Sequence, residues 1–326
     1  MLVPFIVEPK VFSGERHWAP RDLQAHLNSF MRNWKQIGLL VYDGNKFTGS
    51  RFWKAVEQKT KTDLALANLR DFVHRVPKLA GDDKWSGVLQ ETDFESLAKI
   101  ARVCVTSSEK MEELLSSTHF ELRSLGDFAD AAALVEAQKL SNSHINKGES
   151  TQSVWDSRFA VLATPEDKCV KNISIVDRFT VQRQLLGQQT ELHNFLRYLG
   201  RSARSIKNVT VYSMWPYHGE SRGGQRMKKR EINEGMRALS NDTDLRLIGS
   251  LTLRLFDKDS PKDRFVAFGE NYLWDLGHGL EPFVDEYALK DCSATFKTWD
   301  NAESYRKLLN DWRDDEFMIE IWKNRS

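Results

Sequence analysis

The first half of the chain alternates short apolar runs with stretches in which apolar residues recur at helical spacing. The runs 3–8 (VPFIVE) and 37–44 (IGLLVYDG) predict buried strands, and the second run ends in an Asp-Gly turn. Between them, residues 22–34 place apolar side chains every three or four positions, which predicts an amphipathic helix. Strands separated by helices are typical of an α/β domain with a mainly parallel sheet.

The same alternation continues toward residue 199. We expect helices over 52–76, 109–115, 127–140 and 179–199, and strands over 101–105, 118–125, 158–164 and 170–177. The polar stretch 141–153 (SNSHINKGESTQS) predicts a mobile loop. Because two strand-like runs follow this loop, we place the boundary of the first domain later, between residues 177 and 204.

The rest of the chain predicts a second, mixed sheet. We expect strands over 206–213, 245–256, 293–299 and 317–322, a hairpin over 263–275, and helices ending near residue 239 and spanning 301–313. A length of 326 residues exceeds the usual size of one domain. The prediction is therefore an α/β protein with two domains, an N-terminal domain over 1–190 and a C-terminal domain over 204–326.

Composition narrows the class of protein. No run approaches the roughly 18 apolar residues that a membrane-spanning helix needs, so we expect no membrane span. The three cysteines, Cys104, Cys169 and Cys292, lie far apart and form no C-x-x-C pair. This spacing disfavours a disulfide framework and a cysteine zinc site, and it fits a reducing compartment. We therefore expect a cytoplasmic protein.

The net charge is only +1, but the charged residues are distributed unevenly along the chain. Residues 197–230 contain nine Lys or Arg and a single acidic residue, whereas residues 231–326 contain 13 basic and 20 acidic residues. A basic band next to an acidic region favours an anionic partner or an acidic surface on a neighbouring protein.

The basic band is densest around Gly223 and Gly224, and its cations are Arg222, Arg226, Lys228, Lys229 and Arg230. Several cations at a loop–helix junction are typical of phosphate-backbone contacts with nucleic acid. Four ring-bearing residues precede them and offer stacking surfaces: Tyr212, Trp215, Tyr217 and His218. The alternative is a solvated helix face that meets the acidic region of the same molecule.

The segment 260–280 (SPKDRFVAFGENYLWDLGHGL) predicts a strand, a tight turn, a second strand and a Gly-His-Gly turn. Its motifs are K-D-R-F-V at 262–266 and G-H-G-L at 277–280. With the preceding strand, basic helix and long strand, residues 204–326 resemble the phospholipase D-like fold. The resemblance is to the variant at the C-terminus of microtubule-interacting-and-trafficking domain proteins.

The catalytic form of that family requires the pattern H-x-K-x-x-x-x-D, and here the three positions hold Lys262, Arg264 and Gly269. The resemblance therefore implies a non-catalytic member that keeps phosphate affinity through Lys262 and Arg264; the alternative is that both are solvated hairpin charges. His278 is a further candidate nucleophile or base, with Asp275 to orient it. A single histidine in a turn is more often structural.

Acidic residues follow two strands of the first domain, Glu8 after the first and Asp43 after the second. Carboxylates at the carboxyl ends of parallel strands are where a metal-dependent, PIN-like nuclease would hold Mg²⁺ or Mn²⁺. A PIN-like first strand would normally end in Asp, and Asp43-Gly44 is most simply a turn. Apart from this alternative we assign no metal and expect no cofactor. The sequence contains no H-x-x-x-H, P-loop or G-x-S-x-G pattern, which disfavours a zinc hydrolase, a nucleotide hydrolase and a serine hydrolase.

These observations predict a non-catalytic, nucleic-acid-associated component of a bacterial multi-protein system, and analogy suggests antiphage defence as its setting. Two alternatives remain open. One is a metal-dependent nuclease in the N-terminal domain. The other is a protein–protein interaction scaffold whose basic band docks another protein of a complex.

Overall fold

The computed structural model of the chain describes most of its residues. The described ranges are 2–9, 11–14, 20–43, 46–59, 64–76, 78–80, 101–107, 111, 121–164, 170–187, 190–219, 224–256, 263–269, 272–312 and 318–323. The chain divides into two compact units, 1–140 and 141–326. Each unit contains a sheet with helices, which confirms the α/β class predicted from the sequence.

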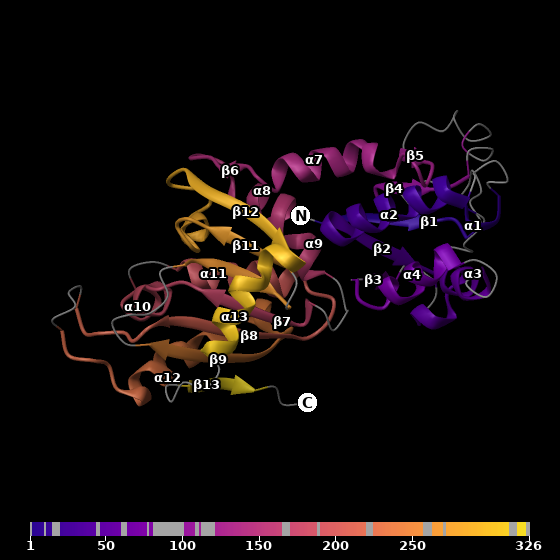
Figure 1. Cartoon of the computed structure of the whole chain (residues 1–326). Helices are drawn as coiled ribbons and strands as arrows, with labels where there is room; N and C mark the ends of the chain where they lie inside the picture. The colour runs from indigo at the N-terminus through magenta and orange to yellow at the C-terminus, as the bar shows by residue number, and fades with distance from the viewer. Residues whose placement is uncertain are drawn as a thin grey trace. The chain divides into compact units, whose positions relative to one another are not determined.

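The first unit contains a five-stranded sheet in the order β3-β2-β1-β4-β5 (Figure 1). Its strands are β1 (Val3–Val7), β2 (Gly38–Tyr42), β3 (Lys78–Ala80), β4 (Val103–Val105) and β5 (Glu121–Arg123). Every neighbouring pair is parallel, as the alternation of strands and helices predicts. The chain builds outward from β1 to β3 and then returns to the other side of β1 with β4.

Helices cover this sheet and supply its aromatic core. They are α1 (Val11–Gly14), α2 (Pro20–Ile37), α3 (Arg51–Lys59), α4 (Leu64–Val73) and α7 (Ala132–Leu140), with short 3-10 turns at Phe47–Gly49 (η1) and Phe128–Asp130 (η3). The ring of Phe5 on β1 lies 5.2 Å from Trp34 of α2 and 4.9 Å from Phe128. The helical spacing of apolar residues in α2 therefore serves to place Phe30 and Trp34 against β1.

The second unit contains an eight-stranded mixed sheet in the order β13-β9-β8-β7-β10-β11-β12-β6. Its strands are β6 (His144–Ile145), β7 (Asn172–Val176), β8 (Lys207–Met214), β9 (Ile248–Phe256), β10 (Phe265–Phe268), β11 (Tyr272–Leu276), β12 (Cys292–Thr298) and β13 (Met318–Lys323). The three strands β7, β8 and β9 are parallel, and all other pairs are antiparallel. The hairpin predicted over 263–275 is confirmed as β10 and β11.

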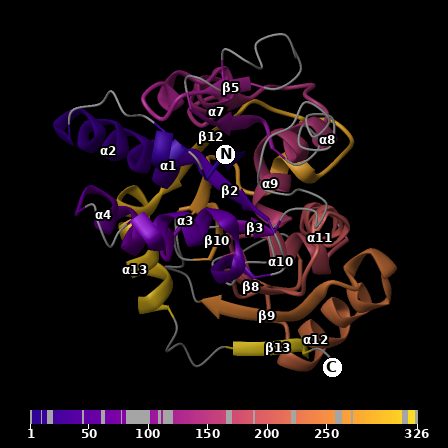
Figure 2. The same cartoon turned by 90° about the vertical axis from the view of Figure 1, so that its right-hand side faces the viewer.

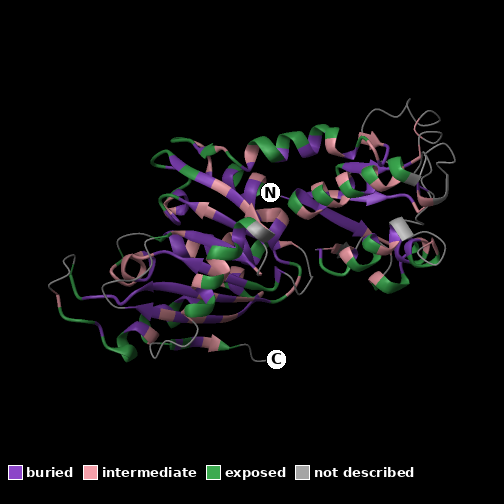
Figure 3. Cartoon of the chain, viewed as in Figure 1, coloured by how far each residue is buried: buried purple, intermediate pink, exposed green. Residues whose placement is uncertain are grey.

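Helices flank both faces of this sheet. They are α8 (Thr151–Val154), a π-helical turn η4 (Trp155–Phe159), α9 (Ala160–Ala163), α10 (Thr180–Leu185), α11 (Glu191–Ser202), α12 (Lys229–Arg237) and α13 (Glu303–Asp311). Short 3-10 turns lie at Ala238–Asn241 (η6), Thr243–Leu245 (η7), Glu281–Phe283 (η8) and Trp299–Ala302 (η9). Figure 3 shows that the strands are mostly buried, whereas α12 is largely exposed.

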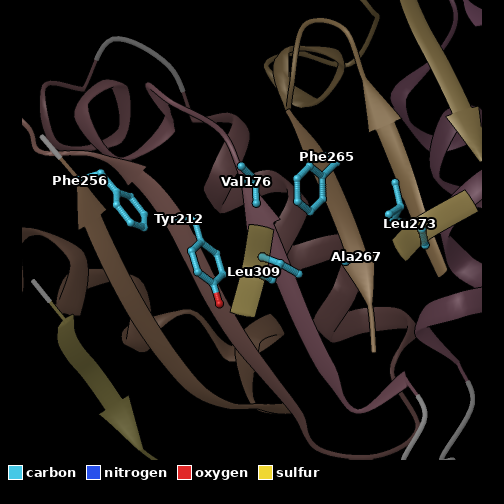
Figure 4. Close-up of a cluster of buried hydrophobic side chains, with 8 residues drawn as sticks. Val176, Tyr212, Phe256, Phe265, Ala267, Leu273 and Leu309 are labelled. Atoms are coloured by element: carbon cyan, nitrogen blue, oxygen red, sulfur yellow. The ribbon is translucent and has the colours of Figure 1, made fainter. Parts of the chain in front are cut away.

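One face of the second sheet packs against α13. Figure 4 shows Leu309 of α13 among the side chains of Val176, Tyr212 and Phe265. The opposite face packs against η4 and α11, where the ring of Phe159 lies 5.8 Å from those of Phe195 and Trp274. Because both faces are covered by apolar contacts, functional groups are left to the edges and ends of this sheet.

The strand predicted over 158–164 is wrong, because this segment is helical. Residues 151–163 form a continuous helical run that begins at Ser150, whose side chain accepts the backbone N–H of Ser153. Trp155, Phe159 and Leu162 are buried at a helical spacing of four and three residues. The apolar run is too short for its spacing to distinguish a strand from a helix without that cap.

The stretch predicted as a mobile loop, 141–153, is instead held in the second sheet. Its residues His144 and Ile145 form β6, which pairs with the start of β12. The guanidinium of the buried Arg158 binds the carboxylate of Glu149 at 2.8 Å and the carbonyl of His144 at 3.1 Å. The polar composition of this segment therefore does not indicate a mobile loop, because a buried arginine binds its polar groups.

The units divide between residues 140 and 141, earlier than the range 177–204 expected from the sequence. The strand β7, which we assigned to the first domain, pairs with β8 and β10 of the second sheet. An apolar run predicts a strand, but its sequence does not indicate which sheet the strand joins. The expected helix 109–115, apart from Met111, and Cys169 lie outside the described residues.

Within the described ranges, no helix has both the length and the apolar composition that crossing a membrane would require.

Candidate functional site

Helix α12 carries much of the predicted basic surface, and its sequence explains its orientation. Its N-terminus is closed by a capping interaction in which the Glu231 carboxylate accepts the backbone N–H of Lys228 at 2.7 Å. Ile232 and Met236, four residues apart, are buried against the unit. The opposite side of the helix is exposed to solvent, which presents its polar and charged residues outward.

A groove of about 530 Å³ lies between α12 and β13, and we call it the α12–β13 groove. Its lining residues are Lys229, Arg230, Asn233, Glu234 and Arg237 from α12, and Met318, Ile319 and Glu320 from β13. The two elements lie side by side in both Figure 1 and Figure 2. The groove is therefore bounded by one helix and one strand that are far apart in the sequence.

The α12–β13 groove meets β13 at its edge. In the described sheet β13 is the terminal strand and pairs with β9 alone. Met318 and Glu320 lie opposite Arg254 and Thr252, whereas Ile319 between them lies opposite Leu253. Successive side chains of a strand point to opposite faces. The three consecutive residues Met318, Ile319 and Glu320 line the α12–β13 groove although their side chains alternate between the two faces. The groove therefore meets β13 at its outer edge and not on one face alone.

The wall formed by α12 is predominantly cationic. Within the described part of the chain, neither Lys229 nor Arg237 has an ion-pair partner. Arg230 donates to Glu234 at 2.7 Å, and this hydrogen bond raises the pKa of the Arg230 guanidinium. Since only one of the three cations has a carboxylate partner on the helix, the wall keeps a positive charge toward the groove.

The structure brings part of the predicted basic band together. Lys229 and Arg230 line the groove, and Lys228 and Arg226 are exposed on the segment that leads into it. Arg222 lies outside the described residues. Sequence reasoning missed Arg237, although it follows Lys229 by eight residues and a helix places such residues on the same side.

The predicted stacking surface is contradicted by burial. Trp215 and Tyr217 are each 6% exposed and Tyr212 is 4% exposed. The indole N–H of Trp215 donates to the carbonyl of Met227 at 2.9 Å, which fastens the segment before α12 to β8. These three rings therefore belong to the core, because Tyr212 lies in the buried strand β8 and Trp215 and Tyr217 follow it directly. Only His218 of the four residues is exposed.

The predicted phosphate-facing hairpin is only partly described. Lys262 lies outside the described residues, and Arg264, which directly precedes β10, is half-buried. His278 is 46% exposed, and its Nδ1 lies 3.5 Å from the Glu281 carboxylate. Asp275 does not orient His278, because its carboxylate accepts from Lys297 at 2.8 Å and from Tyr305 at 2.6 Å. Glu281 is the carboxylate beside this histidine, and sequence reasoning missed it.

A buried carboxylate fixes the turn that carries His278. Asp177, which follows β7, is fully buried and accepts the backbone N–H of Phe179 and of Leu280, each at 3.0 Å. The Arg183 guanidinium lies 3.4 Å from Asp177 and also donates to Glu191 at 2.5 Å. Burial raises the pKa of the Glu191 carboxyl, and Arg183 opposes that rise.

Glu8 lies where the strand order of the first sheet reverses, between the carboxyl ends of β1 and β4. It is 1% exposed, and its carboxylate accepts the hydroxyl of Thr106, which follows β4. Burial, with the nearby Glu8 charge, raises the pKa of the Cys104 thiol. Ligands of open α/β sheets bind at such reversal points, so the position of Glu8 fits a ligand site.

The structure does not bring Asp43 into a metal site with Glu8. The Asp43 carboxylate accepts the backbone N–H of Arg51 at 3.0 Å, which caps the start of α3. Among the residues that the structure describes, no group of three or more His, Cys, Asp or Glu side chains is placed to hold a metal ion.

No protein-family model matches this chain, and no curated protein matches it.

Proposed function

We propose that the C-terminal unit is a non-catalytic docking module that binds an acidic region of a partner protein in the α12–β13 groove. The observation that carries the proposal is the cationic wall of Lys229, Arg230 and Arg237 on a groove that opens at a sheet edge. Complementary charge would steer an acidic partner to this surface and fix its register there.

Two observations favour a protein partner over nucleic acid. Three of the four residues predicted to stack on bases, Tyr212, Trp215 and Tyr217, are buried, which leaves His218 alone of the four exposed for stacking. The groove also contains the carboxylates of Glu234 and Glu320, which can accept backbone or side-chain N–H groups of a protein segment, whereas a sugar–phosphate backbone has no N–H group. The cationic wall is short, because Lys229 and Arg237 are separated by about 12 Å along the helix axis.

Charge reversal on the groove tests this proposal. We expect the double variant Lys229→Glu, Arg237→Glu to weaken binding of a fluorescein-labelled 12-residue peptide of alternating Glu and Thr by at least about tenfold. The measurement is fluorescence anisotropy at low salt. The matched control reverses Arg204 and Arg246, two exposed arginines that do not line the groove. An equal loss in both variants would mean that net charge, and not the groove, attracts the peptide.

A second candidate function belongs to the first unit and rests on the position of Glu8. A buried carboxylate at the reversal point of a parallel sheet is compatible with a metal-dependent nuclease. If this function is present, Mg²⁺- or Mn²⁺-dependent cleavage of single-stranded nucleic acid should fall at least about 100-fold in Glu8→Gln. Asp43→Asn should keep the activity, because Asp43 caps α3. Cleavage that survives Glu8→Gln would remove the candidate.

A further inference from the structure

We infer that the partner segment binds in the α12–β13 groove as an additional β-strand on the outer edge of β13. The inference rests on the proposed docking function and names the form of the ligand, an extended acidic peptide with acidic residues at alternate positions. Strand addition to a free sheet edge draws affinity from main-chain hydrogen bonds and specificity from alternate side chains.

The first support is the free edge itself. β13 pairs with β9 on one side, and in the described sheet no strand pairs with its other side. The backbone N–H and C=O groups on that side therefore point toward the groove or solvent, which makes the edge a template for another strand. The lining by Met318, Ile319 and Glu320 places the groove directly beside these groups.

The second support is a match of spacing. Residues i and i+4 of a strand lie about 13 Å apart and point to the same face. Lys229 and Arg237 lie about 12 Å apart along α12. If the added strand runs along α12, two acidic residues four positions apart on it reach both cations, with Asn233 of the helix between them.

The third support concerns the other face of the added strand. Met318 is 50% exposed, and with Glu320 and Lys323 it lies on the face of β13 opposite to Ile319. The intervening residues of the peptide would lie beside these side chains, where uncharged β-forming residues such as Thr or Val fit. A register shift between Glu320 and Trp322 marks a bulge, which limits the straight part of the edge to Met318–Glu320.

Backbone methylation of the peptide tests strand addition separately from charge attraction. In an extended peptide the N–H groups of alternate residues point to opposite edges. We therefore compare the Glu-Thr peptide with two versions that carry the same charge, one N-methylated at its Glu residues and the other at its Thr residues. We expect one of them to bind at least about tenfold more weakly than the parent. The other should bind like the parent.

The outcomes separate the two claims. If both methylated peptides bind like the parent and the Lys229→Glu, Arg237→Glu variant still loses affinity, then strand addition is wrong and the docking function stands. If the parent peptide does not bind at all, both fail. Equal weakening by both methylated peptides would also contradict the inference, because an added strand on β13 presents only one of its edges to the protein.

Discussion

Replacing Asp177 with alanine is expected to lower the free energy of unfolding of the second unit by about 3–5 kcal/mol. The substitution leaves the half-buried Arg183 with Glu191 alone, and it removes the acceptor of two backbone N–H groups. A buried group that loses its partner keeps its full desolvation cost, which makes the loss larger than the net value of the original bonds.

The matched control for this variant is Asp244→Ala. Asp244 also pairs with two arginines, at 3.1 Å from Arg197 and 2.6 Å from Arg201, but the side chains of these arginines are 39% and 53% exposed. We expect a clearly smaller loss there, because solvent screens exposed ion pairs. The measurement is a urea titration in which hydrogen exchange is monitored on peptides from residues 141–326. This readout gives the free energy of unfolding of the second unit separately from that of the first. Equal losses in the two variants would contradict the structural role of Asp177.

Replacing Gly279 with alanine is expected to cost about 2–4 kcal/mol, for two reasons that can be measured separately. Gly279 has φ +64°, which strains any residue with a side chain. A Cβ at this position would also lie 2.0 Å from Oδ2 of the buried Asp177. Gly187→Ala is the matched control, because Gly187 has φ +66° and open space around its Cβ position.

A double-mutant cycle isolates the close approach. In the Asp177→Ala background, Gly279→Ala should cost only about as much as Gly187→Ala, roughly 1–2 kcal/mol, because the carboxylate that a methyl group would meet has been removed. The measurement is the same urea series. A full cost of Gly279→Ala in both backgrounds would show that the contact between this turn and Asp177 does not determine the fit.

The sequence predicted most of the second sheet because its strands have strong local signals. The long run at 245–256, the hairpin around Gly269 and the helix expected to end near residue 239 each correspond to an observed element. The division of the units was misplaced for a different reason. β7 joins the second sheet through pairing with β8 and β10, and neither partner is visible in the sequence of β7 itself.

The candidate site was predictable only in part. The cations Lys229 and Arg230 were found because basic residues cluster in the sequence. Arg237 was missed because it lies outside that cluster and joins the two cations only through the helix. The contribution of β13 was out of reach, since Met318–Glu320 follow α12 by some eighty residues and meet it only in the folded unit. The aromatic residues near α12 were misread because a buried strand and a stacking surface have the same composition.

The most direct test of the account compares two ligands of the wild-type chain under one condition. The alternating Glu-Thr peptide and a 12-nucleotide single-stranded DNA are titrated separately at the same salt concentration. The account predicts tighter binding of the peptide, with at least about a tenfold loss of that affinity in the Lys229→Glu, Arg237→Glu variant. Tighter binding of the DNA, abolished by the same variant, would contradict it and assign the groove to nucleic acid.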